Sequence, residues 1–486
     1  MGFIRVAVIA SIFGGGGQAD LLNLLYSFPN NMRKLLAEGA FSSGIILVID
    51  YSDSHKWKTN TVIRSISTVH SLFVFLFVFL LFLFAPTIVP YLFPFSSEKL
   101  QIAISLFRYF LLSIPFMALT ALYMAVLHTR KDFLIPAITP ILSSLAIIAC
   151  ILLFYKLLGV YAMATGVLIG GGLQFLVHVL RVKQNGFSVV PIFRVKKEVL
   201  TLFWKNVRSP FLIALLFVIL QQVSMTLAAL LPEGSGAAFT NALVIWQLPQ
   251  GIFSQTVITV FFPLISTSYA HKDEQSTSKA VSQSLIQIIV FMIPSTFLLM
   301  FFSREIVSVV LQRGAFDHFA TMHSATVLVF LAIGLFGVSL FRLLQRIAYA
   351  LQKRTAVLFF TIVAIFIDIV FSIILIRGKL QVAGLGLAQS IAFSVVSLFF
   401  FIYLRKSLPS LTLIPIIRVF FQTIIISAFA SLFLVLASFL WHDYWVQGSS
   451  FHSWGYALLT IFFFTIIVLG LYRYSGISLF PPKKDI

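Results

Sequence analysis

The chain carries very little charge for its length. Only 10% of its 486 residues are Asp, Glu, Lys or Arg, whereas soluble chains contain about 25%. Acidic residues are the scarcest, at 15 against 34 lysines and arginines, which gives a net charge of +19. With 60% hydrophobic residues and a mean hydropathy of +1.03, this composition excludes a soluble domain. It predicts an all-α polytopic membrane protein, because apolar runs of about 20 residues recur along the chain.

Cysteine is almost absent as well. Cys150 is the only one, so neither an internal disulfide nor a thiolate metal site is possible. Polar residues near the ends of the apolar runs, such as His271 and Glu274, lack metal-ligand spacing. The chain also has no Walker loop and no Gly-x-Ser-x-Gly elbow. We therefore expect neither an enzyme nor a cofactor. Without ATP hydrolysis, the remaining energy sources for a membrane protein are Na+ or H+ coupling and the membrane potential.

The apolar runs predict about fourteen membrane helices. The first, 2–13, is short, because four glycines follow it. The second covers roughly 20–49, with a kink at Pro29. The remaining helices are expected at roughly 65–92, 101–127, 133–155, 159–181, 201–231, 236–268, 281–302, 319–351, 355–376, 382–404, 413–440 and 454–473.

Lysine and arginine are concentrated in alternate loops. The positive-inside rule places these loops, and both termini, in the cytoplasm. Because the basic residues are scattered over short loops, they do not indicate a nucleic-acid partner. Leu127-His128-Thr129-Arg130 resembles Leu351-Gln352-Lys353-Arg354, which suggests a parallel repeat of six helices. We expect an N-lobe at 1–182, a basic cytoplasmic linker at 183–200, a C-lobe at 201–406, and two further helices with a cytoplasmic tail at 407–486.

The least usual stretch runs from Pro29 to Ser42. Arg33, Lys34 and Glu38 place two cations and an acid within six residues, between apolar flanks. Such charges inside a membrane cost about 2.5–3.5 kcal/mol each on insertion scales, so they face a wet cavity or a partner. Lys34 and Glu38 can pair on one helix face, whereas Arg33 points about 100° away. Together with Arg5 and Asp20, the cluster is either a cationic site for a phosphate-bearing headgroup or an internal ion-pair network. A third interpretation is a cytosolic helix end with solvated charges.

Asp368 is a lone acid in the middle of an apolar helix. An acid at that depth needs a partner, and it indicates a cation or proton site. A protonated carboxyl that hydrogen bonds a neighbouring helix is the alternative.

These motifs together resemble the MurJ/MviN lipid II flippase family, and the resemblance covers nearly the whole chain in order. The matching segments are Gly2-Phe3-Ile4-Arg5, Asp20, Arg33 to Ser42, Leu231-Pro232-Glu233-Gly234-Ser235, Gln247-Leu248-Pro249, Arg313-Gly314-Ala315-Phe316-Asp317 and Ala350-Leu351-Gln352-Lys353-Arg354-Thr355. The family implies the MOP exporter fold, with two six-helix lobes around a central cavity and two further helices forming a hydrophobic groove. It also implies transport of the undecaprenyl-pyrophosphate-linked peptidoglycan precursor, lipid II, from the cytoplasmic to the periplasmic leaflet of a bacterial inner membrane. Cell-wall synthesis proteins would be possible partners.

By position, the resemblance makes Arg5 and Arg33 cavity arginines and Glu38 a functional acid. It also relates Asp368, Ser224 and Ser372 to the family's cation site, although serines replace two acids there. The family's Asp-Arg pair in the eighth helix is Leu243-Val244 here. Two alternatives therefore stand beside a lipid II flippase. One is a related exporter of drugs or of another lipid-linked oligosaccharide, and the other is a degenerate membrane scaffold that does not transport.

Overall fold

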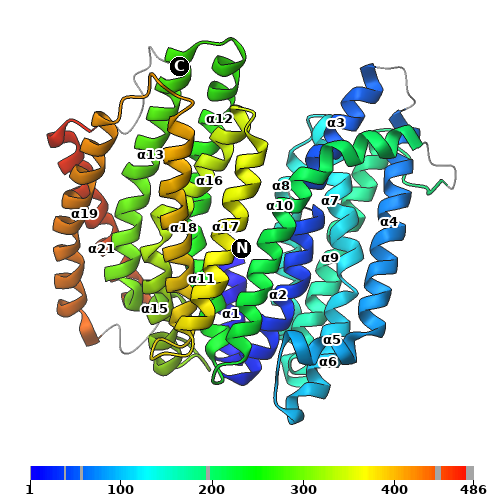
Figure 1. Ribbon diagram of the computed structural model, residues 1–486. Helices are drawn as coiled ribbons and strands as arrows, with labels where there is room; N and C mark the ends of the chain where they lie inside the picture. The colour runs from blue at the N-terminus through cyan, green and yellow to red at the C-terminus, as the bar shows by residue number, and fades with distance from the viewer. Residues whose placement is uncertain (1, 38–39, 55–58, 193–196, 444–449, 478–486) are drawn as a thin grey trace. The chain divides into compact units, whose positions relative to one another are not determined.

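The computed structural model describes residues 2–37, 40–54, 59–192, 197–443 and 450–477. Within these residues every regular element is a helix (Figure 1). The helices up to the middle of the chain are α1 (Gly2–Phe13), α2 (Gly17–Ala37), α3 (Ala40–Ser54), α4 (Thr59–Leu83), α5 (Ala85–Leu92), α6 (Ser97–Leu111), α7 (Ile114–Thr129), α8 (Leu134–Leu158), α9 (Tyr161–Gln184) and α10 (Lys197–Ala229). Those that follow are α11 (Ser235–Pro249), the π-helical turn η1 (Gln250–Ser254), α12 (Gln255–Ala270), α13 (Glu274–Phe301), α14 (Ser303–Leu311), α15 (His318–Ile333), α16 (Leu335–Ala350), α17 (Arg354–Leu375), α18 (Val382–Arg405), α19 (Ile414–Leu440) and α21 (Phe451–Ser475).

The described part of the chain has eleven helices long and apolar enough to cross a membrane, or twelve if the bent pair α15 and α16 is one span. This confirms the predicted all-α polytopic class. The first two predicted helices are not among these spans. α1 has only 12 residues. The second predicted helix corresponds to α2 and α3, which are described separately because residues 38 and 39, between them, lie outside the described residues.

The chain divides into two compact units. Unit 1 comprises Met1–Ile9 and Gly17–Glu233, and unit 2 comprises Ala10–Gly16 and Gly234–Ile486. The short stretch before α2 is tied into unit 2 by its backbone, because the Ala315 N–H donates to the Ser11 carbonyl at 2.8 Å. The lobe boundaries expected from the basic linker stay a prediction.

In unit 1, α7 occupies the centre and packs against α2, α3, α4 and α9. α8 and α9 form the most extensive helix pair. Their backbones approach closely at Gly170, because a Cβ there would lie 2.9 Å from the Ser143 carbonyl oxygen. Small residues at such a crossing are typical of membrane helix pairs.

Replacing Gly170 with alanine is expected to destabilise the α8–α9 pair by about 1–3 kcal/mol, since the added methyl group meets backbone that cannot move aside cheaply. Gly172, on the same helix, is the matched control, because a Cβ there meets nothing within 4 Å. Gly172→Ala should be neutral or slightly stabilising, as alanine is the better helix former. Thermal unfolding of the purified variants in detergent measures both effects. Equal midpoints for the two variants would contradict the close crossing.

Unit 2 is built around α13, α15, α16 and α18, with α19 and α21 side by side against α13 and α14 (Figure 1). Aspartates begin two of its helices. The Asp273 carboxylate accepts the Ser276 N–H at 2.9 Å at the start of α13, and the Asp317 carboxylate accepts the Ala320 N–H at 2.8 Å at the start of α15. These caps satisfy backbone donors that a helix start leaves open.

Candidate functional site

One face of α2 carries a row of polar side chains. Asn23, Tyr26, Asn30, Arg33 and Lys34 are spaced so that they lie within about 100° of one another around the helix axis, and all five are half-buried. The remaining positions of α2 are largely apolar and buried, with Leu21, Leu22, Leu24, Leu25, Phe28 and Met32 in the core of unit 1. The helix is therefore held in the bundle by its apolar side and presents a polar face.

Arg5 of α1 joins this polar face through Tyr26. The Arg5 Nη1 donates to the Tyr26 hydroxyl at 3.4 Å, and its Cζ lies 5.4 Å from the centre of the tyrosine ring. The ring itself packs against Phe110 of α6, with centroids 5.6 Å apart. The Arg5 Nε is buried and has no hydrogen-bond partner among the described residues. The guanidinium is thus positioned by an aromatic ring while it keeps donor capacity for an anion.

Arg33 and Lys34 lie one residue apart and contact different groups. Arg33 donates through Nε and Nη2 to the Asn30 side-chain oxygen, at 3.4 and 3.2 Å. The Lys34 ammonium donates to the Gln221 side-chain oxygen of α10 at 3.1 Å. Glu38, the expected partner of Lys34, lies outside the described residues. Asp20 is buried near the start of α2.

Sequence reasoning singled out the charges of this face and passed over its neutral members. Tyr26 and Asn30 precede Arg33 by seven and three residues, which is the spacing of one helix face. This spacing is the sequence signal by which the two neutral residues could have been found. Gln221 joins two helices of unit 1, because its side-chain oxygen on α10 accepts the hydrogen bond from Lys34 of α2.

Two of the three residues predicted for a cation or proton site, Asp368 and Ser372, lie together in unit 2. The Ser372 hydroxyl donates to the Asp368 carboxylate at 3.2 Å, one turn apart on α17, and both side chains are 2% exposed. Ser224 belongs to α10 in unit 1, where its hydroxyl donates to the Leu220 carbonyl at 3.1 Å. No cluster of three or more potential metal ligands among His, Cys, Asp and Glu occurs within the described ranges.

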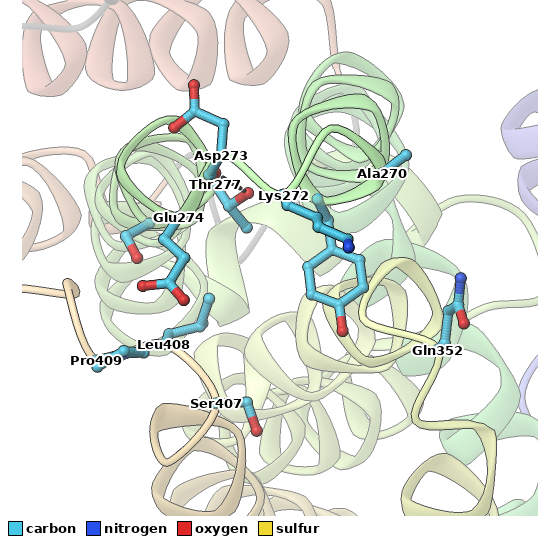
Figure 2. Close-up of a pocket in the computed structure, with 11 residues that line it drawn as sticks. Ala270, Lys272, Asp273, Glu274, Thr277, Gln352, Ser407, Leu408 and Pro409 are labelled. Atoms are coloured by element: carbon cyan, nitrogen blue, oxygen red, sulfur yellow. Dashed lines mark hydrogen bonds between the residues drawn. The ribbon is translucent and has the colours of Figure 1, made fainter.

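A second polar site lies in unit 2, where three loops meet. It is a pocket with a volume of about 410 Å³. The pocket lies between the α12–α13 turn, the α16–α17 turn and the segment after α18 (Figure 2). Lys272, Asp273 and Glu274 line one part of it, and Gln352 and Ser407 line another. The pKa of the Asp273 carboxyl is lowered by the hydrogen bond from the Ser276 backbone N–H. Asp273 thus serves to cap α13.

A buried carboxyl group lies at the opposite end of α13, on the short helix α14. Glu305 is 4% exposed, and the Ser438 hydroxyl of α19 donates a hydrogen bond to its carboxylate. Burial raises the pKa of Glu305 to about 7, although the positive charge of Arg304 opposes this effect. Glu305 therefore joins α14 to the C-terminal helix pair through a group that titrates near neutral pH.

Solved structures with similar folds are membrane transporters. One described as lipid II flippase MurJ in an inward closed conformation superposes with a TM-score of 0.80 and 24% identity, over 97% of this chain and 96% of the other. A multidrug resistance MATE family transporter of the MOP superfamily, in an inward-facing conformation, gives a TM-score of 0.75 at 14% identity, over 84% of this chain and 94% of the other. At these identities the likeness establishes the fold, which is MurJ- and MATE-like.

The sequence itself establishes the family. Residues 9–454 match the family model described as lipid II flippase MurJ. A relative from Borreliella burgdorferi, named "Probable lipid II flippase MurJ", is 30% identical over 98% of this chain and 94% of its own length. A relative of the same name from Aquifex aeolicus is 26% identical over 85% of this chain and 81% of its own. The chain therefore belongs to the lipid II flippase MurJ family, which consists of multi-pass membrane transporters and not of enzymes.

Proposed function

We propose that this MurJ-family flippase binds the diphosphate of lipid II on the polar face of α2, using Arg5, Arg33 and Lys34. The single observation that carries the proposal is the arrangement of these cations in unit 1. Two guanidinium groups and one ammonium group share a half-buried face with the hydroxyl of Tyr26. Guanidinium groups suit phosphate oxygens, because their planar forks donate two parallel hydrogen bonds.

The need for such a face follows from the chemistry of the substrate. A diphosphate cannot cross about 30 Å of hydrocarbon unaided, whereas an isoprenoid tail can remain in the bilayer throughout. A flippase must therefore shelter only the headgroup. We propose that alternating access of two lobes carries the headgroup from the cytoplasmic to the periplasmic leaflet of a bacterial inner membrane, with both termini in the cytoplasm. The exposed apolar side chains of α19 and α21, among them Leu436 and Phe462, suit contact with the lipid tail.

Asp368 and Ser372 are the residues we propose for coupling to a cation or a proton. The carboxylate and the hydroxyl are adjacent, and both are buried within the α17 span. An acid at that position is costly unless a positive charge or a proton accompanies it.

Leu243 and Val244 of α11 replace the family's acid and base, so we assign the cations of unit 1 the main share of diphosphate binding.

Complementation tests the proposal. The full chain, expressed in bacteria depleted of their own lipid II flippase, should restore growth, and lipid II should become accessible to a labelling reagent added from the periplasmic side. A chain that reaches the membrane and restores neither growth nor labelling would overturn the role. Efflux of cationic drugs without labelled lipid II would instead identify an exporter of the MATE type.

A further inference from the structure

The first part of α10 extends beyond the membrane-spanning part of that helix. α10 has 33 residues, and its apolar span is the 20-residue segment Pro210–Ala229. A span of this length already covers the hydrocarbon core, so residues 197–209 lie outside it. In Figure 1 this part of α10 runs across the end of the neighbouring unit 1 helices before the helix changes direction.

This segment has one side bound to the protein. Val199, Phe203 and Val207 recur every four residues and are buried, at 0%, 8% and 0% exposure. α3 approaches this side closely at Gly44, where a Cβ would meet the Val207 and Phe203 side chains. Packing therefore holds the segment in place, and it determines which side of the helix faces away from the protein.

The other side is exposed and basic. Trp204 is 53% exposed, and Lys205 and Arg208 are exposed beside it. With Leu200 and Thr201 they line a surface groove of about 570 Å³. Among the described residues, no hydrogen bond or ion pair involves the side chain of Lys205 or Arg208. Lys197 adds a third cation to the segment, and Glu198 is its one acid.

Trp204 fixes the depth of this groove relative to the bilayer. Its ring packs against that of Phe211, with centroids 6.1 Å apart, and Phe211 is the second residue of the α10 span. Tryptophan is enriched at membrane interfaces, where its ring lies at headgroup level. Arg208 and Lys205 are within two turns of the start of the same span, on the face of the protein that the positive-inside rule assigns to the cytoplasm.

We propose that Trp204, Lys205 and Arg208 form a binding site for the phosphate headgroup of an anionic phospholipid in the cytoplasmic leaflet. Arg208 would hold the phosphate through its guanidinium fork, Lys205 would add a second positive charge, and the Trp204 ring would contact the glycerol region. Charge complementarity selects this occupant, because juxtamembrane cations attract anionic lipids within a Debye length of the surface. The site is separate from the α2 face and does not depend on lipid II transport.

Tryptophan quenching by brominated lipids tests the site in the purified full chain. Phosphatidylglycerol and phosphatidylcholine with brominated acyl chains are titrated separately into the protein in detergent. The chain has six tryptophans, so the signal of Trp204 is the difference between the wild type and Trp204→Phe. We expect this signal to be quenched by phosphatidylglycerol at a roughly 30-fold lower mole fraction than by phosphatidylcholine, as two surface cations predict.

The preference for phosphatidylglycerol should disappear in K205A/R208A, which retains Trp204, and persist in K205R/R208K, which retains the charges. K183A/R405A is the matched control, because it removes one exposed lysine and one exposed arginine at helix ends that the positive-inside rule also assigns to the cytoplasm, and it should leave the preference unchanged. Equal quenching by the two lipids in the wild type would overturn the site, as would an unchanged preference in K205A/R208A. Loss of the preference in millimolar inorganic phosphate would identify a site for free anions and overturn the lipid assignment.

Discussion

Cells that depend on this chain for lipid II transport are expected to stop growing when Arg33 is replaced by alanine. The loss of a charged donor to a phosphate costs about 1.5–3 kcal/mol, which lowers affinity by roughly 10- to 150-fold. Arg33→Lys should retain part of the activity, because lysine keeps the charge and loses the planar fork. Growth, together with the amount of lipid II labelled from the periplasmic side, measures the effect.

The control for this substitution is Arg418→Ala. Arg418 is exposed near the start of α19 and, like Arg33, lies on a helix of the described structure. It should support normal growth at the same membrane level of protein. If Arg33→Ala transported lipid II as well as Arg418→Ala does, Arg33 would not bind the diphosphate, and its contact with Asn30 would serve only to stabilise α2.

The protein should lose stability as the pH rises through the titration of Glu305. Burial raises the pKa of this carboxyl from 4.5 to about 7 in the folded state. Between these values the folded protein binds more protons than the unfolded chain, so the free energy of unfolding falls with increasing pH. The stabilisation is complete below about pH 4.5 and is lost above about pH 7. Its size is about 3 kcal/mol, which is large for one side chain.

Glu305→Gln separates this group from other titrations. Glutamine can still accept the Ser438 hydroxyl and carries no charge, so the variant should lack this part of the pH dependence and be more stable than the wild type at pH 8. Unfolding midpoints in detergent at pH 5 and pH 8 provide the measurement. Glu274→Gln, at an exposed acid, should keep the pH dependence of the wild type. An identical pH dependence in the wild type and Glu305→Gln would show that the Glu305 carboxyl is not buried as described.

Much of the architecture could be predicted from the sequence, because a bilayer leaves few choices. The expected span at 133–155 corresponds to α8, Leu134–Leu158, and that at 382–404 to α18, Val382–Arg405. Apolar length alone sets such helices. The bend between α15 and α16, within the helix expected at 319–351, escaped this reasoning, because hydropathy does not indicate a change in helix direction.

The candidate site could be predicted only in part. Charge scarcity made Arg5 and Arg33 conspicuous, but their partners Tyr26 and Asn30 are ordinary residues for a membrane helix. Glu305 gave no sequence signal either, since a glutamate near a helix end is usually solvated. Its burial depends on α19, which comes more than a hundred residues later in the chain and supplies Ser438. Contacts of this kind arise from tertiary packing, which local patterns do not encode.

The contact between Trp204 and Phe211 also has a consequence for bilayers of different thickness. An indole ring held at the interface fixes the depth at which the apolar span of α10 begins. In a thicker membrane the bilayer must thin around this helix, and in a thinner one the helix must tilt, while the indole stays among the headgroups. Acyl-chain length should therefore change the tilt of α10 and leave the immersion depth of Trp204 constant.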